Sequence, residues 1–208
     1  MDIDLLKIGM VKGRQYETIV STINSKSIKN AAPIGIICSG KSKVLCRIFK
    51  GSKTLDNILS QKEFIVNITH DPELFTLSTL GNLPENYFNQ NCSIKNADAY
   101  FKCEVINFSE AIKQSDPIKK KDEAIVIKAE VKELVINKNT KALNRGFNYV
   151  IESLSNLTRF DMFDDNQKEE YLNRFREANR VVVKVGHKED ILAMKAIKKE
   201  LMKKGLKP

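Results

Sequence analysis

The sequence predicts a mainly β fold with α, in which six strands form a closed or partly closed barrel that a helical region follows. Three observations lead to this prediction. The first two thirds of the chain hold six short β-rich segments bounded by Gly, Ser, Asn or Asp. Only one short helix is expected between these segments, which disfavours a parallel α/β sheet. The final third carries apolar residues at helical spacing.

The predicted strands are short and closely spaced along the chain. They cover residues 16–23, 31–38, 43–49, 63–69, 99–108 and 123–136. The last of them alternates between a polar face and an apolar face made of Ile125, Ile127, Ala129 and Val131. Such alternation is typical of a half-buried antiparallel strand. The segment 81–97 is expected to be a long loop, and long ordered loops are often functional.

Three helices are predicted in the final third. The first carries one apolar stripe made of Leu143, Phe147, Val150, Ile151, Leu154 and Leu157. The second starts at the acidic pair Asp164 and Asp165, and the third is marked by Ile191, Met194, Ile197 and Leu201. No low-complexity linker is found, so we expect a barrel domain over 1–138 and a helical region over 139–208 packed on the barrel.

The chain is basic, which raises the question of an anionic partner. Its formal net charge is +9, and part of the excess lies in the lysine-rich tail over 195–207. Because that tail has no aromatic residue among its lysines, a solvated helix face is favoured over a nucleic-acid site. A basic nucleic-acid-binding barrel remains an alternative from another class. Its affinity would fall steeply with salt.

Cysteine and histidine spacing indicates no metal site. The four cysteines form no CxxC pair and the two histidines, His70 and His187, stand apart. Because Cys38, Cys46 and Cys103 lie in apolar strand patterns, they are expected to be buried free thiols. The start of the chain lacks the pattern of a signal peptide, and no apolar run is long enough to span a bilayer. We therefore expect a cytoplasmic protein.

The stretch "RIFKGSKTLDN" predicts a pocket for an anion. A strand end, a glycine turn and the first turn of a short helix follow one another here, and a helix N-terminus attracts anions. Charge, turn and hydroxyl donors would come from Arg47, Lys50, Gly51, Ser52 and Thr54. The chemistry suits a phosphate monoester, although the P-loop spacing is missing. The alternative is that Ser52 only caps the helix and the lysines are solvated.

The stretch "NAAPIG" lies one strand earlier and favours a ligand. Since Pro33 cannot donate a ladder hydrogen bond, its strand must be an edge or be interrupted there. The small residues before it would let a flat ligand approach the main chain, although a barrel-closing bulge is the alternative. Asn67, in the middle of the strand 63–69, needs a polar partner from either the protein or a ligand.

Four stretches together resemble a known family. The series "ETIVST", "NAAPIG", "RIFKGSKTLDN" and "KEFIVNITHDPELF" is similar to the archaeal family of FMN-binding split-barrel proteins related to flavin reductases. The helical stretch "NRGFNYVIESLSNLTR" resembles the C-terminal region of that family. The resemblance implies a six-stranded Greek-key barrel and a homodimer with FMN near the subunit interface.

The resemblance also implies which residues hold FMN. The ribityl chain and flavin ring would be lined by Asn30, Ala31, Ala32 and Pro33. The phosphate would be held by Arg47, Lys50, Gly51, Ser52 and Thr54. Asn57 would support the helix start, and Asn67 would face the flavin. "HDPELF" resembles a loop of the family, without a role for Asp71 or Phe75, and Asn144 and Arg145 match the family without an assigned role.

These residues suit two functions equally. The first is an FMN-dependent oxidoreductase of flavin-reductase type, and the second is a module that stores or delivers FMN without turnover. No Rossmann glycine motif is present, so an NADH or NADPH donor would have to stack directly over the flavin. Neither histidine has a Ser or Cys partner at motif spacing, and no catalytic residue is assigned. Only the enzyme would oxidise NADH or NADPH.

Overall fold

The computed structural model describes residues 3–81, 83–115 and 120–208. The chain forms two compact units, Met1–Leu143 and Asn144–Pro208. The sequence placed the boundary at 138/139 instead. The later boundary has a local cause, because Ala142 donates a backbone hydrogen bond to Ile8 and the carbonyl of Leu143 accepts one from Glu17. That the helices pack on the barrel stays a prediction.

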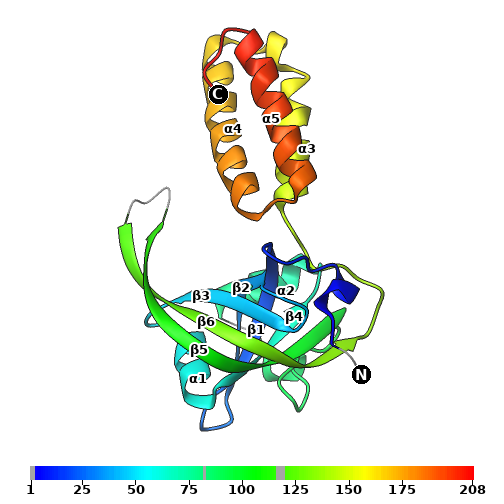
Figure 1. The fold of residues 1–208 in the computed structure, drawn as a ribbon, viewed down its shortest axis with the longest axis vertical. Helices are drawn as coiled ribbons and strands as arrows, with labels where there is room; N and C mark the ends of the chain where they lie inside the picture. The colour runs from blue at the N-terminus through cyan, green and yellow to red at the C-terminus, as the bar shows by residue number, and fades with distance from the viewer. Residues whose placement is uncertain (1–2, 82, 116–119) are drawn as a thin grey trace. The chain divides into compact units, whose positions relative to one another are not determined.

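The first unit is the six-stranded barrel that the sequence predicts. Its strands are β1 (Gln15–Ile23), β2 (Lys29–Cys38), β3 (Lys43–Phe49), β4 (Glu63–Ile68), β5 (Ala99–Ser115) and β6 (Lys120–Ile136). They close in the order β1-β2-β3-β6-β5-β4, with antiparallel neighbours (Figure 1). Because β4 pairs with β1 and β5, the connection from β3 crosses the barrel in the manner of a Greek key. A short 3-10 helix, η1 (Leu5–Ile8), precedes the barrel.

Two α-helices, not one, lie between the strands in the described part of the chain. The predicted helix is α1 (Lys53–Gln61), in the crossing connection. The second is α2 (Pro72–Leu80), where "HDPELF" was expected to be a loop. Asp71 accepts hydrogen bonds from the backbone amides of Glu73 and Leu74, and Pro72 occupies the first helical position. This start follows the usual chemistry of a helix N-terminus.

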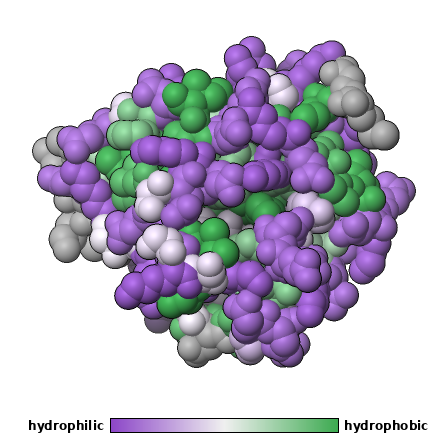
Figure 2. Space-filling model, turned by 90° about the horizontal axis from the view of Figure 1, so that it is seen from below, coloured by the Kyte–Doolittle hydropathy of each residue, from purple (hydrophilic) through white to green (hydrophobic). Residues whose placement is uncertain are grey.

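The barrel interior is apolar, as the strand alternation predicts. Ile125, Ile127, Ala129 and Val131 of β6 are all buried there. A second apolar cluster lies on the outer face of β1, β2 and β4, and it includes Leu74 of α2 and described residues of the segment 81–97. In that segment the described residues contain one 3-10 turn, η2 (Glu85–Tyr87), and a bridge between Phe88 and Ile94. Figure 2 shows the end of the barrel that carries α1, where apolar side chains are set among hydrophilic ones.

The second unit consists of α3 (Gly146–Leu157), η3 (Phe160–Met162), α4 (Asp165–Val185) and α5 (Lys188–Lys203). Asp164 caps α4 and forms a capping box with Gln167, which confirms the predicted acidic helix start. The apolar stripe predicted for α3 does not form one buried face. Val150 is buried, whereas Phe147 and Ile151 are 61% and 48% exposed. No helix among the described residues has the length and apolarity to cross a membrane.

All four cysteines are buried with free thiols. Burial raises the pKa of Cys46 from 9.0 to about 12 and that of Cys92 from 9.0 to about 11. It also raises the pKa of Cys103 well above its ordinary value. These thiols are therefore neutral at physiological pH and poorly reactive in the folded chain.

The buried thiols predict how stability changes at high pH. Well below pH 9.0, the ordinary pKa of the thiol, Cys46 is protonated in both the folded and the unfolded chain. Above that value the unfolded thiol ionises first, so the free energy of unfolding should decline until about pH 12. Urea unfolding at a series of pH values checks this, with Cys46→Val as the control. The variant should lose stability less steeply than the wild type, and an identical slope would contradict the assignment.

Candidate functional site: a cavity beside the unpaired edge of β2

The start of α1 presents free backbone donors. Gly51, at φ +83°, turns the chain from β3 into the helix. The Ser52 hydroxyl donates to the Phe49 carbonyl (3.1 Å) and accepts from the Leu55 amide (3.3 Å). The amide of Asp56 donates to the Ser52 carbonyl (3.1 Å), whereas the amides of Lys53 and Thr54 have no backbone acceptor among the described residues. The positive end of the helix dipole lies at the same place, so an anion is favoured there.

The edge of β2 is open beside this helix. Within the described chain, β3 pairs with β2 only over Ile36–Cys38, while β1 pairs with β2 over residues 29–37. Residues 29–35 therefore have a sheet partner on one side only. Of the two alternatives that Pro33 predicts, an edge and an interruption, the structure has the edge, because β2 is continuous and Pro33 pairs with Ile19 of β1. Arg47 follows the last residue of β3 that pairs with β2, so it flanks the same split.

A cavity of about 470 Å³ lies between these features, a volume typical of ligand pockets. Its walls are the β1–β2 hairpin, the first residues of β2, the first turns of α1 and the chain after α2. The lining residues are Asn24, Ile28, Lys29, Asn30, Ala31, Lys53, Asp56, Asn57, Gly81 and Leu83.

Two asparagine side chains fix the walls of the cavity. Asn30 donates from Nδ2 to Oγ1 of Thr54 (3.0 Å), which ties β2 to α1. Asn57 donates from Nδ2 to Oγ1 of Thr22 (3.0 Å), which ties α1 to β1. The helix start is therefore held at a set position against the barrel.

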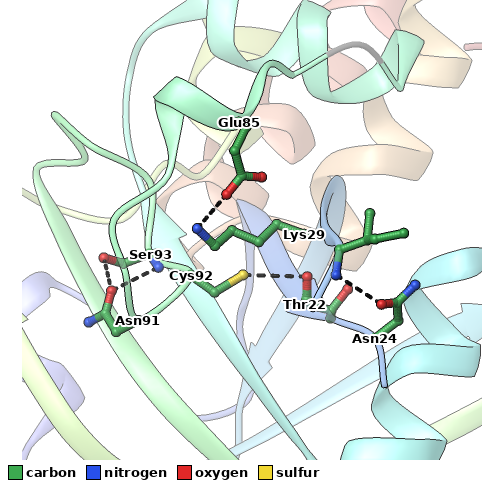
Figure 3. Close-up of polar contacts among 8 residues, drawn as sticks. Thr22, Asn24, Lys29, Glu85, Asn91, Cys92 and Ser93 are labelled. Atoms are coloured by element: carbon green, nitrogen blue, oxygen red, sulfur yellow. Dashed lines mark hydrogen bonds and ion pairs between the residues drawn. The ribbon is translucent and has the colours of Figure 1, made fainter. Parts of the chain in front are cut away.

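The charged lining consists of two lysines and one aspartate. Lys53 is exposed and makes no ion pair or hydrogen bond through its side chain with any described residue. Lys29 is instead paired with Glu85, at 2.6 Å between Nζ and Oε1 (Figure 3). Asp56 stands three residues after Lys53 on α1. Lys53 is thus the cation most accessible to an anion at the helix N-terminus.

The predicted ligand residues divide into two groups. Asn30, Ala31 and Asn57 line the cavity, and Ala32 and Pro33 continue the unpaired edge of β2. The others, Arg47, Lys50, Gly51, Ser52, Thr54 and Asn67, do not line it. Thr54 is buried and uses its hydroxyl to accept from Asn30, and Ser52 caps α1 as its alternative role predicts.

Lys50 is engaged by acidic side chains of β5 and β6. Its ammonium group lies 2.9 Å from Glu110 and 2.8 Å from Glu123. The hydrogen bonds to Glu123 and Glu110 raise the pKa of Lys50, and Lys50 in turn lowers the pKa of Glu123. An anion would have to displace both carboxylates to bind this lysine.

Asn67 finds its polar partners within the protein. It has no exposed surface. Its Nδ2 donates to the Ile19 carbonyl (3.0 Å) and the Ser21 hydroxyl (2.9 Å), and its Oδ1 accepts from the Ile94 amide (2.8 Å). The side chain therefore joins β4 to β1 and to the segment 81–97, and it does not face the cavity.

Sequence reasoning missed several lining residues. Lys53 follows the predicted cap directly, and its place at the first helical position was a usable indication. Nothing in the sequence indicated that Lys29 and Asp56 line a cavity, because charged residues near strand and helix starts are commonly solvated. Asn144, which had no assigned role, donates to the Val185 carbonyl (2.7 Å) and accepts from the Gly146 amide (2.8 Å). It therefore ties the start of α3 to the end of α4.

Comparisons with known proteins give the family and a liganded relative. The model described as "Protein of unknown function (DUF447) N-terminal domain" matches residues 16–138, and that described as "Protein of unknown function (DUF447)" matches 144–199. The crystal structure of FMN-bound protein MM1853 from Methanosarcina mazei, assigned to DUF447, is 30% identical with a TM-score of 0.53. The match covers 94% of this chain and 99% of that chain.

Two further proteins show lower similarity. Uncharacterized protein MJ1453 of Methanocaldococcus jannaschii is 25% identical over 175 residues, which are 82% of this chain and 90% of that protein. A putative flavin reductase with a split barrel domain from Shewanella frigidimarina is 11% identical with a TM-score of 0.47. That match covers 64% of this chain and 72% of the other.

Proposed function

The chain belongs to the DUF447 family, and we propose that it is an FMN-binding flavoprotein that acts as a flavin-reductase-like oxidoreductase. The observation that carries this proposal is the cavity in which the start of α1 meets the unpaired edge of β2. The FMN-bound relative from the same family supports it.

The residues present fit the phosphate end of FMN. A phosphate monoester carries about −1.5 to −2 charges at neutral pH. The amides of Lys53 and Thr54 would donate to its oxygens, with the helix dipole and the Lys53 ammonium adding positive charge. Arg47, beside the split, would add a second cation. Lys50 would take part only after leaving Glu110 and Glu123.

The rest of the ligand would lie along β2. Asn30, Ala31, Ala32 and Pro33 present small or flat surfaces and an open backbone edge to the ribityl chain and ring. Asn57 and Thr54 would support this wall through their hydrogen bonds to Thr22 and Asn30. The isoalloxazine ring supplies the redox chemistry when FMN is bound. The protein supplies position, nearby charge and control of access.

A homodimer is part of the proposal. Ile28 lines the cavity yet is 59% exposed, and Leu80, next to the lining residue Gly81, is 65% exposed. Large apolar side chains at the rim suggest that a second subunit covers the ligand. Sedimentation of the FMN-loaded protein tests this: a dimer is expected, and a monomer at all concentrations would contradict it.

Oxidation of NADH and NADPH tests the enzymatic part of the proposal. FMN-loaded protein should oxidise one of the two faster than the same concentration of free FMN does, with oxygen or added flavin as acceptor. Protein that binds FMN and shows no excess rate with either donor is a storage or delivery module. The loss of nicotinamide absorbance gives the rate directly.

A further inference from the structure

Lys29 stands out among the residues of the cavity because its charge is already engaged. Its Nζ lies 2.6 Å from Oε1 of Glu85, and 5.9 Å from the ring centroid of Phe88. The Lys29 side chain is only 13% exposed, whereas that of Glu85 is 69% exposed. The cation is thus sheltered, whereas its carboxylate partner is largely exposed. Figure 3 shows the contact between the two side chains.

The segment that carries Glu85 is fixed to the barrel. Glu85 begins η2, and the buried ring of Phe88 anchors the chain just after it. The Tyr87 carbonyl accepts a hydrogen bond from the Lys95 amide (2.8 Å), which holds the turn in place. Glu85 therefore meets Lys29 from a defined position.

We propose that Lys29 is a further ligand-binding residue of the cavity, and that Glu85 competes with the ligand for its ammonium group. This inference rests on the proposed function. Lys29 lines the cavity and has three rotatable donors on a flexible stem, so it can change partners. While it is paired with Glu85, the cavity keeps Lys53 as its unpaired lysine. A ligand with more negative charge than one carboxylate would draw Lys29 away from Glu85.

The competition predicts opposite effects of the two partners on FMN affinity. Glu85→Gln removes the competitor and should lower the Kd about two- to fivefold, the range expected for an ion pair with one exposed partner. Lys29→Gln removes a cation from the cavity and should raise the Kd about tenfold. In the double variant the Kd should equal that of Lys29→Gln, since the ammonium group for which Glu85 and FMN compete is absent.

The four proteins are compared by the quenching of FMN fluorescence, a measurement of binding and not of turnover. Glu130→Gln is the control: it makes the same charge change, removes an ion pair with Lys132 at 2.5 Å, and lies outside the cavity. Its Kd should stay within about twofold of the wild type.

Circular dichroism checks that each variant is folded. Glu85→Asp keeps the charge but has a shorter side chain, so its Kd should lie between those of the wild type and Glu85→Gln.

Three outcomes overturn the inference while FMN still binds the wild type. A Kd that rises in Glu85→Gln would mean that Glu85 orients Lys29 for the ligand. An unchanged Kd would mean that the pair is only structural. A Glu85→Gln effect that persists in the Lys29→Gln background would be a through-space effect of charge. If the wild type takes up no FMN, the proposed function itself fails.

Discussion

Replacing Asn67 by alanine should lower the free energy of unfolding by about 3 kcal/mol, because each buried group that loses its hydrogen bond costs about 1–3 kcal/mol. The amide side chain bonds the Ile19 carbonyl, the Ser21 hydroxyl and the Ile94 amide, all in the barrel unit. Because the site is fully buried, these three groups cannot form replacement hydrogen bonds with bulk water in the variant. Urea unfolding followed by circular dichroism measures the change.

The Asn67→Ala variant also separates a structural role from a ligand contact. The FMN affinity of its folded fraction should change less than about threefold, since the side chain does not line the cavity. Asn107→Ala, at an exposed position of β5, is the matched control and should change stability by no more than about 0.5 kcal/mol. Unchanged stability together with a large loss of FMN affinity would make Asn67 a ligand residue instead.

Replacing Lys53 by glutamate should give the largest loss of FMN affinity, about 10- to 100-fold. A hydrogen bond to a charged group contributes about 1.5–3 kcal/mol, and the new carboxylate would repel the phosphate at the helix N-terminus. Lys53→Gln should lose about tenfold, since repulsion is absent. Fluorescence titration with FMN gives both values. Stability should change little because Lys53 is exposed and makes no ion pair with the described residues.

An exposed lysine of the same unit provides the control for Lys53. Lys41→Gln makes the same charge change outside the cavity and should leave the Kd within about twofold. If Lys41→Gln and Lys53→Gln weaken FMN binding equally, the effect is one of net charge. The phosphate would then lie elsewhere than the start of α1.

The barrel was predictable because successive side chains along a strand point to opposite faces of the sheet. Side chains of β6 alternate between interior and solvent, so Ile125, Ile127, Ala129 and Val131 could be placed in the core from their spacing alone. The helix α2 was missed although Asp71 and Pro72 mark its start. Its apolar residues, Leu74, Phe75, Leu77 and Leu80, lie around the whole helix, so no one-sided stripe reveals the helical period.

The candidate site was predictable in its backbone and less so in its side chains. Pro33 indicated an edge or an interrupted strand, and Ser52 with Gly51 indicated a helix start, because both depend on local geometry. Which cations stay unpaired depends on residues far away in the sequence. Lys50 meets Glu110 and Glu123, and Lys29 meets Glu85, only once the barrel has closed.

This difference is the reason why we propose Lys53, and not Lys50, as the main cation for the phosphate. Both stand within four residues of each other in "KGSK", and sequence alone gives no reason to prefer either. The structure pairs Lys50 with two carboxylates and places Lys53 at the first position of α1, in the lining of the cavity.

Equilibrium titration of the ligand-free chain with FMN and with riboflavin tests the central claim most directly. The chain has no tryptophan, so flavin fluorescence can be followed without emission from that residue. The structure predicts one FMN per chain, bound at least about tenfold more tightly than riboflavin, because only FMN carries a phosphate for the start of α1. Equal affinities for the two flavins, or no uptake of either, would contradict the claim.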